Sequence, residues 1–149
     1  VLRPKSVGSV KLADANPNSP PLIDPAFLKD ERDLDTMLAG VKQAQQIMQA
    51  PSFDAHRGKA LYAGASNDDE ELKEDIRNRA DTIYHPVGTC KMGPDSDPNA
   101  VVDQRLRVRG IKSLRVIDAS IMPKIVSGNT NAPSIMIGEK GAHMILEDA

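Results

Sequence analysis

The sequence predicts an α+β fold, and the mixture of strand-like and helix-like stretches along the chain is the basis for this prediction. A short strand pattern covers residues 6–12, and apolar residues recur at helical spacing in residues 31–49 and 68–79. After Tyr84, short β-type runs lead into a last helical stretch over residues 133–147. A chain of 149 residues, 40% of them apolar, is long enough to bury a core of one ordinary domain.

The first strand is expected from Val7, Val10 and Leu12, which are available to one side of a sheet. Residues 14–25 are rich in proline and asparagine, so they are predicted to form an extended loop.

Two helices are expected next. Asp30 is a plausible N-cap for the helix over residues 31–49, and Pro51 marks its end. The helix over residues 68–79 is acidic and has only a thin apolar stripe, formed by Leu72 and Ile76. The apolar positions at helical spacing in the first of these helices are Leu34, Met37, Leu38, Val41, Ala44 and Met48.

Three short runs after Tyr84 are candidate strands, at residues 101–102, 106–108 and 114–117. The final helix is expected to begin near Pro133, because proline suits a first turn whose amide has no partner. Small residues at positions 138, 141 and 142 would let this helix approach a neighbour closely.

Composition excludes several classes of partner. The net charge of −2, without a long run of one sign, argues against nucleic acid and anionic membrane surfaces. The single Cys90 rules out an internal disulfide and fits a reducing compartment, so we expect a cytoplasmic protein; peripheral attachment of a longer parent protein to the inner membrane stays open. The absence of an initial Met suggests a fragment or a processed chain.

The common site motifs are absent. No glycine pair fits the Gly-x-Gly-x-x-Gly dinucleotide fingerprint, and residues 88–93 have P-loop glycine spacing but continue with Pro94. The histidines at positions 56, 85 and 143 are too scattered for a local zinc motif, so no metal site is predicted. A hydrolase that uses Ser120 or Thr89 with His85 would lack a nucleophile elbow.

Two segments stand out, and each has two interpretations. His85 precedes Pro86, which favours an extended backbone at His85; the imidazole is either an exposed side chain at the start of a strand or a group that moves a proton. Residues 117–133 join a strand-like run to the final helix through a polar loop. Asn129 and Asn131 there either cap the helix or contact a ligand.

Together these segments resemble the C-terminal region of the glucose–methanol–choline (GMC) oxidoreductase family, in particular its choline-type and aliphatic alcohol dehydrogenases. The resemblance covers essentially the whole chain, because the family's segments occur in the same order and spacing. They are His-Pro-Val-Gly-Thr-Cys-Lys-Met-Gly (85–93), Val-Val-Asp (101–103), Leu-Arg-Val-Arg-Gly (106–110), Leu-Arg-Val-Ile-Asp-Ala-Ser (114–120) and Gly-Asn-Thr-Asn-Ala-Pro (128–133).

The resemblance implies a domain organisation. Residues 1–113 would belong to a substrate-binding domain with an antiparallel sheet and helices. Residues 114–149 would supply a strand and a helix that complete a Rossmann-like FAD domain. The glycine-rich FAD loop of that domain is absent from this sequence, so we expect the chain alone to bind FAD weakly, to be inactive, and to cover its missing surfaces by self-association.

The resemblance also implies site residues. His85 matches the histidine that accepts the alcohol proton as hydride passes to the flavin, and Asn129 matches a second active-site position that hydrogen-bonds the substrate oxygen. An amide takes no proton at neutral pH, which leaves His85 as the base. Asp118 and Ala119 match a turn that meets the cofactor. Asn131 and Pro133 match the segment beside the flavin ring.

The expected function is therefore oxidation of a primary alcohol, either choline or an aliphatic alcohol, with FAD as cofactor. Dehydrogenase activity is favoured over oxidase activity, and the sequence does not identify the electron acceptor. The alternative is a non-catalytic binding or assembly module on the same scaffold.

Overall fold

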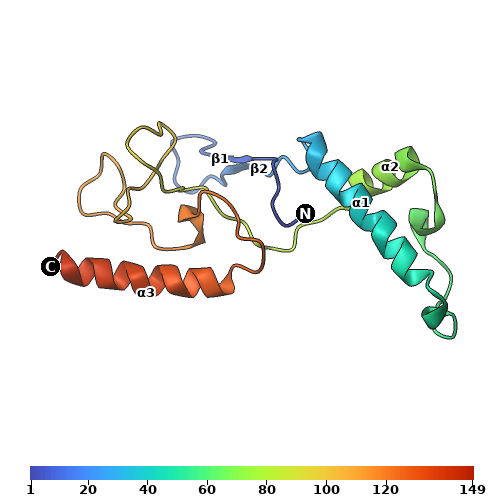
Figure 1. Ribbon diagram of the computed structural model, residues 1–149. Helices are drawn as coiled ribbons and strands as arrows, with labels where there is room; N and C mark the ends of the chain where they lie inside the picture. Colours follow the sequence, from blue (N-terminus) through green and yellow to red (C-terminus); the bar gives the residue numbers. More distant parts are fainter. The chain divides into compact units, whose positions relative to one another are not determined.

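A computed structural model describes all residues from 1 to 149, and it has the α+β content expected from the sequence (Figure 1). The chain divides into two compact units, residues 3–82 with Val1 and residues 83–149 with Leu2. The predicted domain boundary, between residues 113 and 114, falls inside the second unit. That boundary concerns the assignment of segments to the domains of a longer enzyme, and it stays a prediction.

The first unit begins with a two-stranded antiparallel sheet, in which β1 (Ser9–Lys11) pairs with β2 (Leu22–Asp24). β1 confirms the first predicted strand, but β2 lies in the stretch predicted as a loop. A β-carbon on Gly8 would lie 2.0 Å from the carbonyl oxygen of Asp24. Only glycine lets the two backbones approach this closely at the end of the sheet.

Helix α1 (Glu31–Met48) confirms the predicted first helix, and Asp30 caps it as expected by accepting a hydrogen bond from the amide of Arg32. Asp33, in the first turn, is a buried carboxylate that accepts hydrogen bonds from the amides of Lys5 and Ser6, each at 2.8 Å. Because a buried carboxylate is stable only when hydrogen-bonded, these contacts fix the N-terminal segment against α1.

Helix α2 (Asp69–Arg79) confirms the second predicted helix and lies beside α1 (Figure 1). Its thin stripe of Leu72 and Ile76 is buried against Leu34 and Leu38 of α1, and these four side chains form the core of the first unit. Two short 3₁₀ turns, η1 (Pro51–Phe53) and η2 (Tyr62–Ala65), lie between the two helices in the sequence.

The second unit consists of loops, the 3₁₀ turn η3 (Ala119–Ile121) and helix α3 (Asn131–Glu147). The core of this unit brings together residues from all three parts of the segment after Tyr84. Its buried members are Val102, Leu106, Ile121, Met122 and Ile137.

The three candidate strands of this region are wrong as strands. They form only isolated bridges, Met92 with Val102, Val102 with Val108, and Arg107 with Arg115. Left-handed backbone at Leu106 (φ 62°) interrupts the extended path between these bridges, so no continuous ladder of hydrogen bonds forms. The β-type residues instead supply the buried side chains of the core.

Helix α3 confirms the predicted last helix and begins at Asn131, two residues before Pro133. Gly141 makes the expected close approach: a β-carbon there would lie 2.4 Å from Cγ2 of Ile117. No helix of the chain combines the length and the apolar character needed to cross a membrane.

Candidate active site

His85 lies at the centre of a small polar cluster in the second unit. Its imidazole is half-buried, and both ring nitrogens have a partner from the loop before α3. Nδ2 of Asn129 lies 2.9 Å from Nε2 of His85. Oγ1 of Thr130 lies 3.1 Å from Nδ1 of the same ring. Asn129 and Thr130 therefore contact the imidazole of His85 although they follow it by 44 and 45 positions in the sequence.

The backbone around His85 is held on both sides. Tyr84 has a left-handed φ of 63°, which is costly for a bulky residue, and Pro86 restricts His85 to extended conformations. Further on, the amide of Cys90 donates to the carbonyl of Ser120 at 3.0 Å, and the amide of Met92 donates to that of Ile121 at 2.8 Å. The segment that carries His85 is thus tied to η3 and to the core beneath it.

Asn129 and Thr130 reach His85 from the N-terminus of α3. Thr130 is the N-cap of this helix, but its hydroxyl makes no capping hydrogen bond. Of the two interpretations of Asn129 and Asn131, capping of α3 does not hold, because the Asn129 amide contacts His85 and Asn131 is already the first helical residue.

Asp118 and Ala119 lie where the η3 turn begins. The Asp118 carboxylate accepts a hydrogen bond from the amide of Ser120 at 2.7 Å, so it caps this turn. Ala119 packs against the core of the unit. Ala119 precedes Ser120, whose carbonyl accepts the hydrogen bond from the amide of Cys90 in the segment after His85.

Asn131 and Pro133 occupy the first turn of α3, with Asn131 exposed and Pro133 half-buried. Helix α3 contacts η3, so the four predicted cofactor residues lie on two elements that pack together. Contacts of these residues with a cofactor stay a prediction.

Thr130 is the site residue that the sequence did not indicate. It stands between the two asparagines of the polar loop, at the start of a helix. Threonine at the start of a helix is ordinarily interpreted as an N-cap, so the sequence gives no indication of a contact with His85.

This arrangement suits proton transfer beside a polar group. An imidazole is the usual side chain for accepting a proton near neutral pH, and the Asn129 amide offers a neutral hydrogen-bond donor next to it. No group of three or more His, Cys, Asp or Glu side chains is placed to hold a metal ion.

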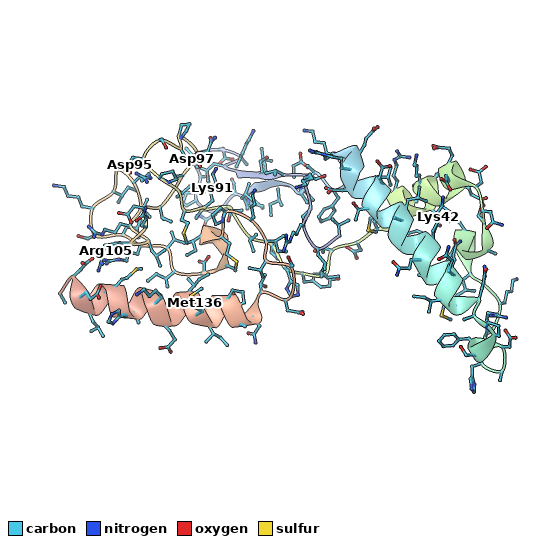
Figure 2. The ribbon with its side chains drawn as sticks, in the orientation of Figure 1. Lys42, Lys91, Asp95, Asp97, Arg105 and Met136 are labelled. Carbon is cyan, nitrogen blue, oxygen red and sulfur yellow. The ribbon has the colours of Figure 1, made fainter.

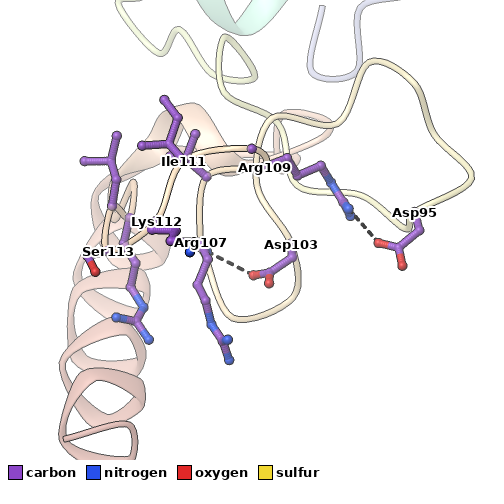
Figure 3. Close-up of a pocket in the computed structure, with 11 residues that line it drawn as sticks. Asp95, Asp103, Arg107, Arg109, Ile111, Lys112 and Ser113 are labelled. Carbon is purple, nitrogen blue, oxygen red and sulfur yellow. Dashed lines mark hydrogen bonds and ion pairs between the residues drawn. The ribbon is translucent and has the colours of Figure 1, made fainter.

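A separate hollow of about 500 Å³ lies over residues 103–115 and is rich in charge (Figure 3). Three of its basic groups have acidic partners: Arg109 binds Asp95 at 2.6 Å and the carbonyl of Gly93 at 2.7 Å, and Arg107 and Arg115 pair with Asp148. Close by, Lys91 and Asp97 form a similar pair at 2.7 Å (Figure 2). None of these residues forms a hydrogen bond or ion pair with His85, and the hollow is distinct from the histidine cluster.

Comparison with known proteins gives a consistent result. The model of the GMC oxidoreductase C-terminal region matches residues 4–138. An alcohol dehydrogenase [acceptor] of Pseudomonas putida is 53% identical over 146 residues, which is 97% of this chain and 26% of that protein. The mitochondrial choline dehydrogenase of Homo sapiens is 48% identical over 145 residues, 97% of this chain and 24% of that protein.

Solved structures agree. Pyridoxine 4-oxidase from Mesorbium loti superposes with a TM-score of 0.89 at 33% identity, over 98% of this chain and 28% of that one. A formate oxidase of Aspergillus oryzae, studied for modification of its FAD, gives a TM-score of 0.84 at 30% identity, over 99% of this chain and 26% of that one. The homologues are FAD-dependent.

This chain spans about a quarter of the length of the curated relatives. The match nevertheless runs through nearly all of its residues, in sequence and in fold. The chain belongs to the GMC oxidoreductase family, of which it represents the C-terminal region.

Proposed function

We propose that this chain is the C-terminal part of an FAD-dependent dehydrogenase that oxidises a primary alcohol to an aldehyde. The observation that carries the proposal is the pair formed by Nε2 of His85 and Nδ2 of Asn129, 2.9 Å apart. It combines a proton acceptor, the half-buried imidazole of His85, with a neutral hydrogen-bond donor, the exposed amide of Asn129. In this proposal residues 1–113 belong to the substrate-binding domain and residues 114–149 complete the FAD domain.

His85 is the base in this account. The O–H group of an alcohol is a very weak acid, and a positioned base accelerates its deprotonation by about 10²–10⁴-fold. The substrate hydroxyl would take the place of the Asn129 amide at Nε2. Asn129 cannot accept the proton, so it would hold the substrate oxygen by donating a hydrogen bond.

The residues present fit a flavin beside this cluster. No side chain caps the amides in the first turn of α3, and free amides at a helix N-terminus stabilise nearby negative charge. Asn131 and Pro133 in this turn, with Asp118 and Ala119 in the adjoining η3 region, would contact the cofactor. FAD supplies the hydride acceptor when it is bound.

The proposed substrate class is inferred from the names of the relatives and from the aromatic residues of this chain. Relatives act on alcohols and on choline, as their names state. A quaternary ammonium is usually held by aromatic faces, and the chain has only four Phe and Tyr residues. Of these, Tyr62 already stacks under Arg79, 3.3 Å from its guanidinium carbon to the ring centroid. A primary alcohol is therefore the proposed substrate class, and a screen with aliphatic alcohols and choline separates the two candidates that the relatives' names suggest.

The test uses the FAD-loaded enzyme that contains this chain. His85→Ala should retain flavin but reduce it about 10²–10⁴-fold more slowly when mixed anaerobically with a primary alcohol. His56→Ala is the matched control, because His56 is exposed in the loop after η1 and its side chain forms no hydrogen bond or ion pair. It should reduce its flavin at the wild-type rate.

An unchanged rate in His85→Ala would refute the proposal. The scaffold would then be a non-catalytic binding or assembly module, and the cluster around His85 would serve only to hold α3 in place.

A further inference from the structure

We propose that Thr130 is a positioning residue for His85: its hydroxyl accepts a hydrogen bond from Nδ1–H and so keeps the lone pair on Nε2 free for the substrate. This inference rests on the proposed function, since it assigns a role around the same base. It adds a residue that neither the sequence motifs nor the relatives' names assign.

The first observation is the direction of the hydrogen bonds. The atom of Asn129 on Nε2 is the amide nitrogen, at 2.9 Å, and an amide nitrogen can only donate. In this orientation of the Asn129 amide, Nε2 accepts and carries no hydrogen. A neutral imidazole has one N–H group, which must then be on Nδ1. The atom facing Nδ1 is Oγ1 of Thr130, at 3.1 Å, which is placed to accept that hydrogen.

The second observation is that the Thr130 hydroxyl does not cap α3, although Thr130 occupies the N-cap position. Threonine at a helix N-cap ordinarily has extended backbone, and its hydroxyl accepts from an amide of the first turn. Thr130 instead has φ −89° and ψ 0°, and it makes no capping hydrogen bond. Giving up a side-chain cap lowers the stability of a helix. The hydroxyl is used on His85 instead.

The third observation is that the rest of Thr130 is fixed. Its carbonyl accepts hydrogen bonds from the amide of Ser134 at 3.0 Å and from the hydroxyl of Ser134 at 2.7 Å. The first turn of α3 thus holds the backbone of Thr130, and a β-branched side chain has few rotamers. The hydroxyl is therefore a rigid partner for the ring.

The chemical consequence concerns the reaction itself. When Nε2 takes the alcohol proton, the ring becomes an imidazolium, and the Nδ1–H group donates more strongly to Thr130. Without the hydroxyl the ring can adopt the other tautomer, with hydrogen on Nε2, in which it cannot accept the proton. Thr130 should therefore affect the chemical step more than alcohol binding.

The experiment compares Thr130→Val and Thr130→Ser in the FAD-loaded enzyme that contains this chain. Valine keeps the shape and removes the hydroxyl, whereas serine restores it. Thr36→Val in α1 is the matched control, because the Thr36 hydroxyl bonds only the carbonyl of Arg32 in its own helix. The limiting rate of flavin reduction and the alcohol dissociation constant are measured by anaerobic rapid mixing.

The limiting rate in Thr130→Val should fall by about 10- to 100-fold, the loss expected for a hydrogen bond to a charged group. The dissociation constant should change little, Thr130→Ser should recover most of the rate, and Thr36→Val should match the wild type. A wild-type rate in Thr130→Val alongside a slow His85→Ala would overturn the role of Thr130 and leave the proposed function standing. A wild-type rate in both variants would overturn both.

A second readout does not depend on turnover. Nitrogen NMR of the wild-type enzyme, labelled with ¹⁵N-histidine and assigned with His85→Ala, reports which ring nitrogen of His85 carries the hydrogen. Hydrogen on Nδ1 is the expected result. Hydrogen on Nε2 would overturn the inference, because Thr130 would then donate to the ring and Asn129 would accept from it.

Discussion

At the scale of single residues, Asp148 shows how one carboxylate can organise a loop region. Its oxygens bind Arg105 at 2.9 Å, Arg107 at 3.6 Å and also Arg115. Arg107 and Arg115 are partners in an isolated bridge, so their like charges face each other across two backbone segments. Like charges placed opposite each other are destabilising, and Asp148 offsets this repulsion from the end of α3.

The same contacts set the pKa of this carboxylate. Partial burial raises the pKa of Asp148, but hydrogen bonds and charges from Arg105, Arg107 and Arg115 outweigh it and hold the pKa below its ordinary 3.8. A carboxylate with a lowered pKa in the folded state stabilises the fold above its unfolded pKa, and this stabilisation is lost as the pH falls through the folded value.

We predict that the stability of the second unit decreases as the pH falls below about 4, and that Asp148→Asn flattens this dependence. Thermal unfolding of both proteins between pH 7 and pH 2 measures it. Glu139→Gln is the control, because Glu139 is exposed on α3 and forms no ion pair. An unchanged acid dependence in Asp148→Asn would show that other carboxylates control the transition.

At the scale of elements, the contact of α3 with residues 114–118 decides where the polar loop lies. Gly141 faces Ile117 so closely that a β-carbon would lie 2.4 Å from Cγ2 and 2.9 Å from Cδ1 of that side chain. Ile137, one turn earlier, is buried in the core. The helix is therefore seated on the core by its middle turns, while its N-terminus presents Asn129 and Thr130 to His85.

Gly141→Ala should destabilise the protein. Replacing glycine by alanine inside a helix ordinarily gains about 1 kcal/mol, but overpacking against Ile117 costs about 1–3 kcal/mol, so the overlap should outweigh the gain. Gly138→Ala in the same helix meets no atom within 4 Å and should stabilise by up to about 1 kcal/mol. The free energies of unfolding in urea measure both effects.

A double variant sharpens the comparison. In an Ile117→Ala background the overlap at position 141 disappears, so Gly141→Ala should then be neutral or favourable. Equal destabilisation by Gly141→Ala in both backgrounds would show that overlap with Ile117 is not the cause of the destabilisation.

The helices were predictable because their signals are local. Asp30 caps α1 through an amide two residues away, and the apolar stripes of α1 and α2 repeat every three or four residues, so both signals are visible in a short stretch of sequence. β2 was missed because Leu22 and Ile23 become a strand only through pairing with β1, across a proline-rich stretch. The strands expected at residues 101–117 do not form, because Leu106 and Ser113 adopt a left-handed backbone conformation. Leucine and serine rarely adopt this conformation, so the sequence does not predict it.

The candidate site was predictable to a similar degree. His85 and Asn129 were indicated by their motifs, and the structure brings their side chains together. Thr130 was not indicated, because its partner is 45 positions away and its place at a helix start suggests capping.

At the scale of the whole molecule, both units expose many large apolar side chains, among them Val7, Leu12 and Ile23 in the first and Ile135 and Leu146 in the second. Exposed apolar surface of this kind often marks contacts with other protein segments. The relatives are about four times as long as this chain, which is consistent with a site that needs further segments to hold its cofactor.

The 149-residue chain by itself should therefore not retain stoichiometric FAD. Its purified form should lack the visible flavin absorbance that the longer enzyme shows, and it should not oxidise alcohols. Stoichiometric flavin in the purified chain would contradict this expectation. It would mean that residues of this chain make most of the contacts with the cofactor.

The central claim is that His85 accepts the proton of the alcohol, and chemical rescue of His85→Ala tests it most directly. In the FAD-loaded enzyme, reduction of the flavin by alcohol should be about 10²–10⁴-fold slower in this variant, and added imidazole should restore the rate in proportion to its concentration. His85→Ala that reduces its flavin as fast as the wild type, with no response to imidazole, would contradict the account.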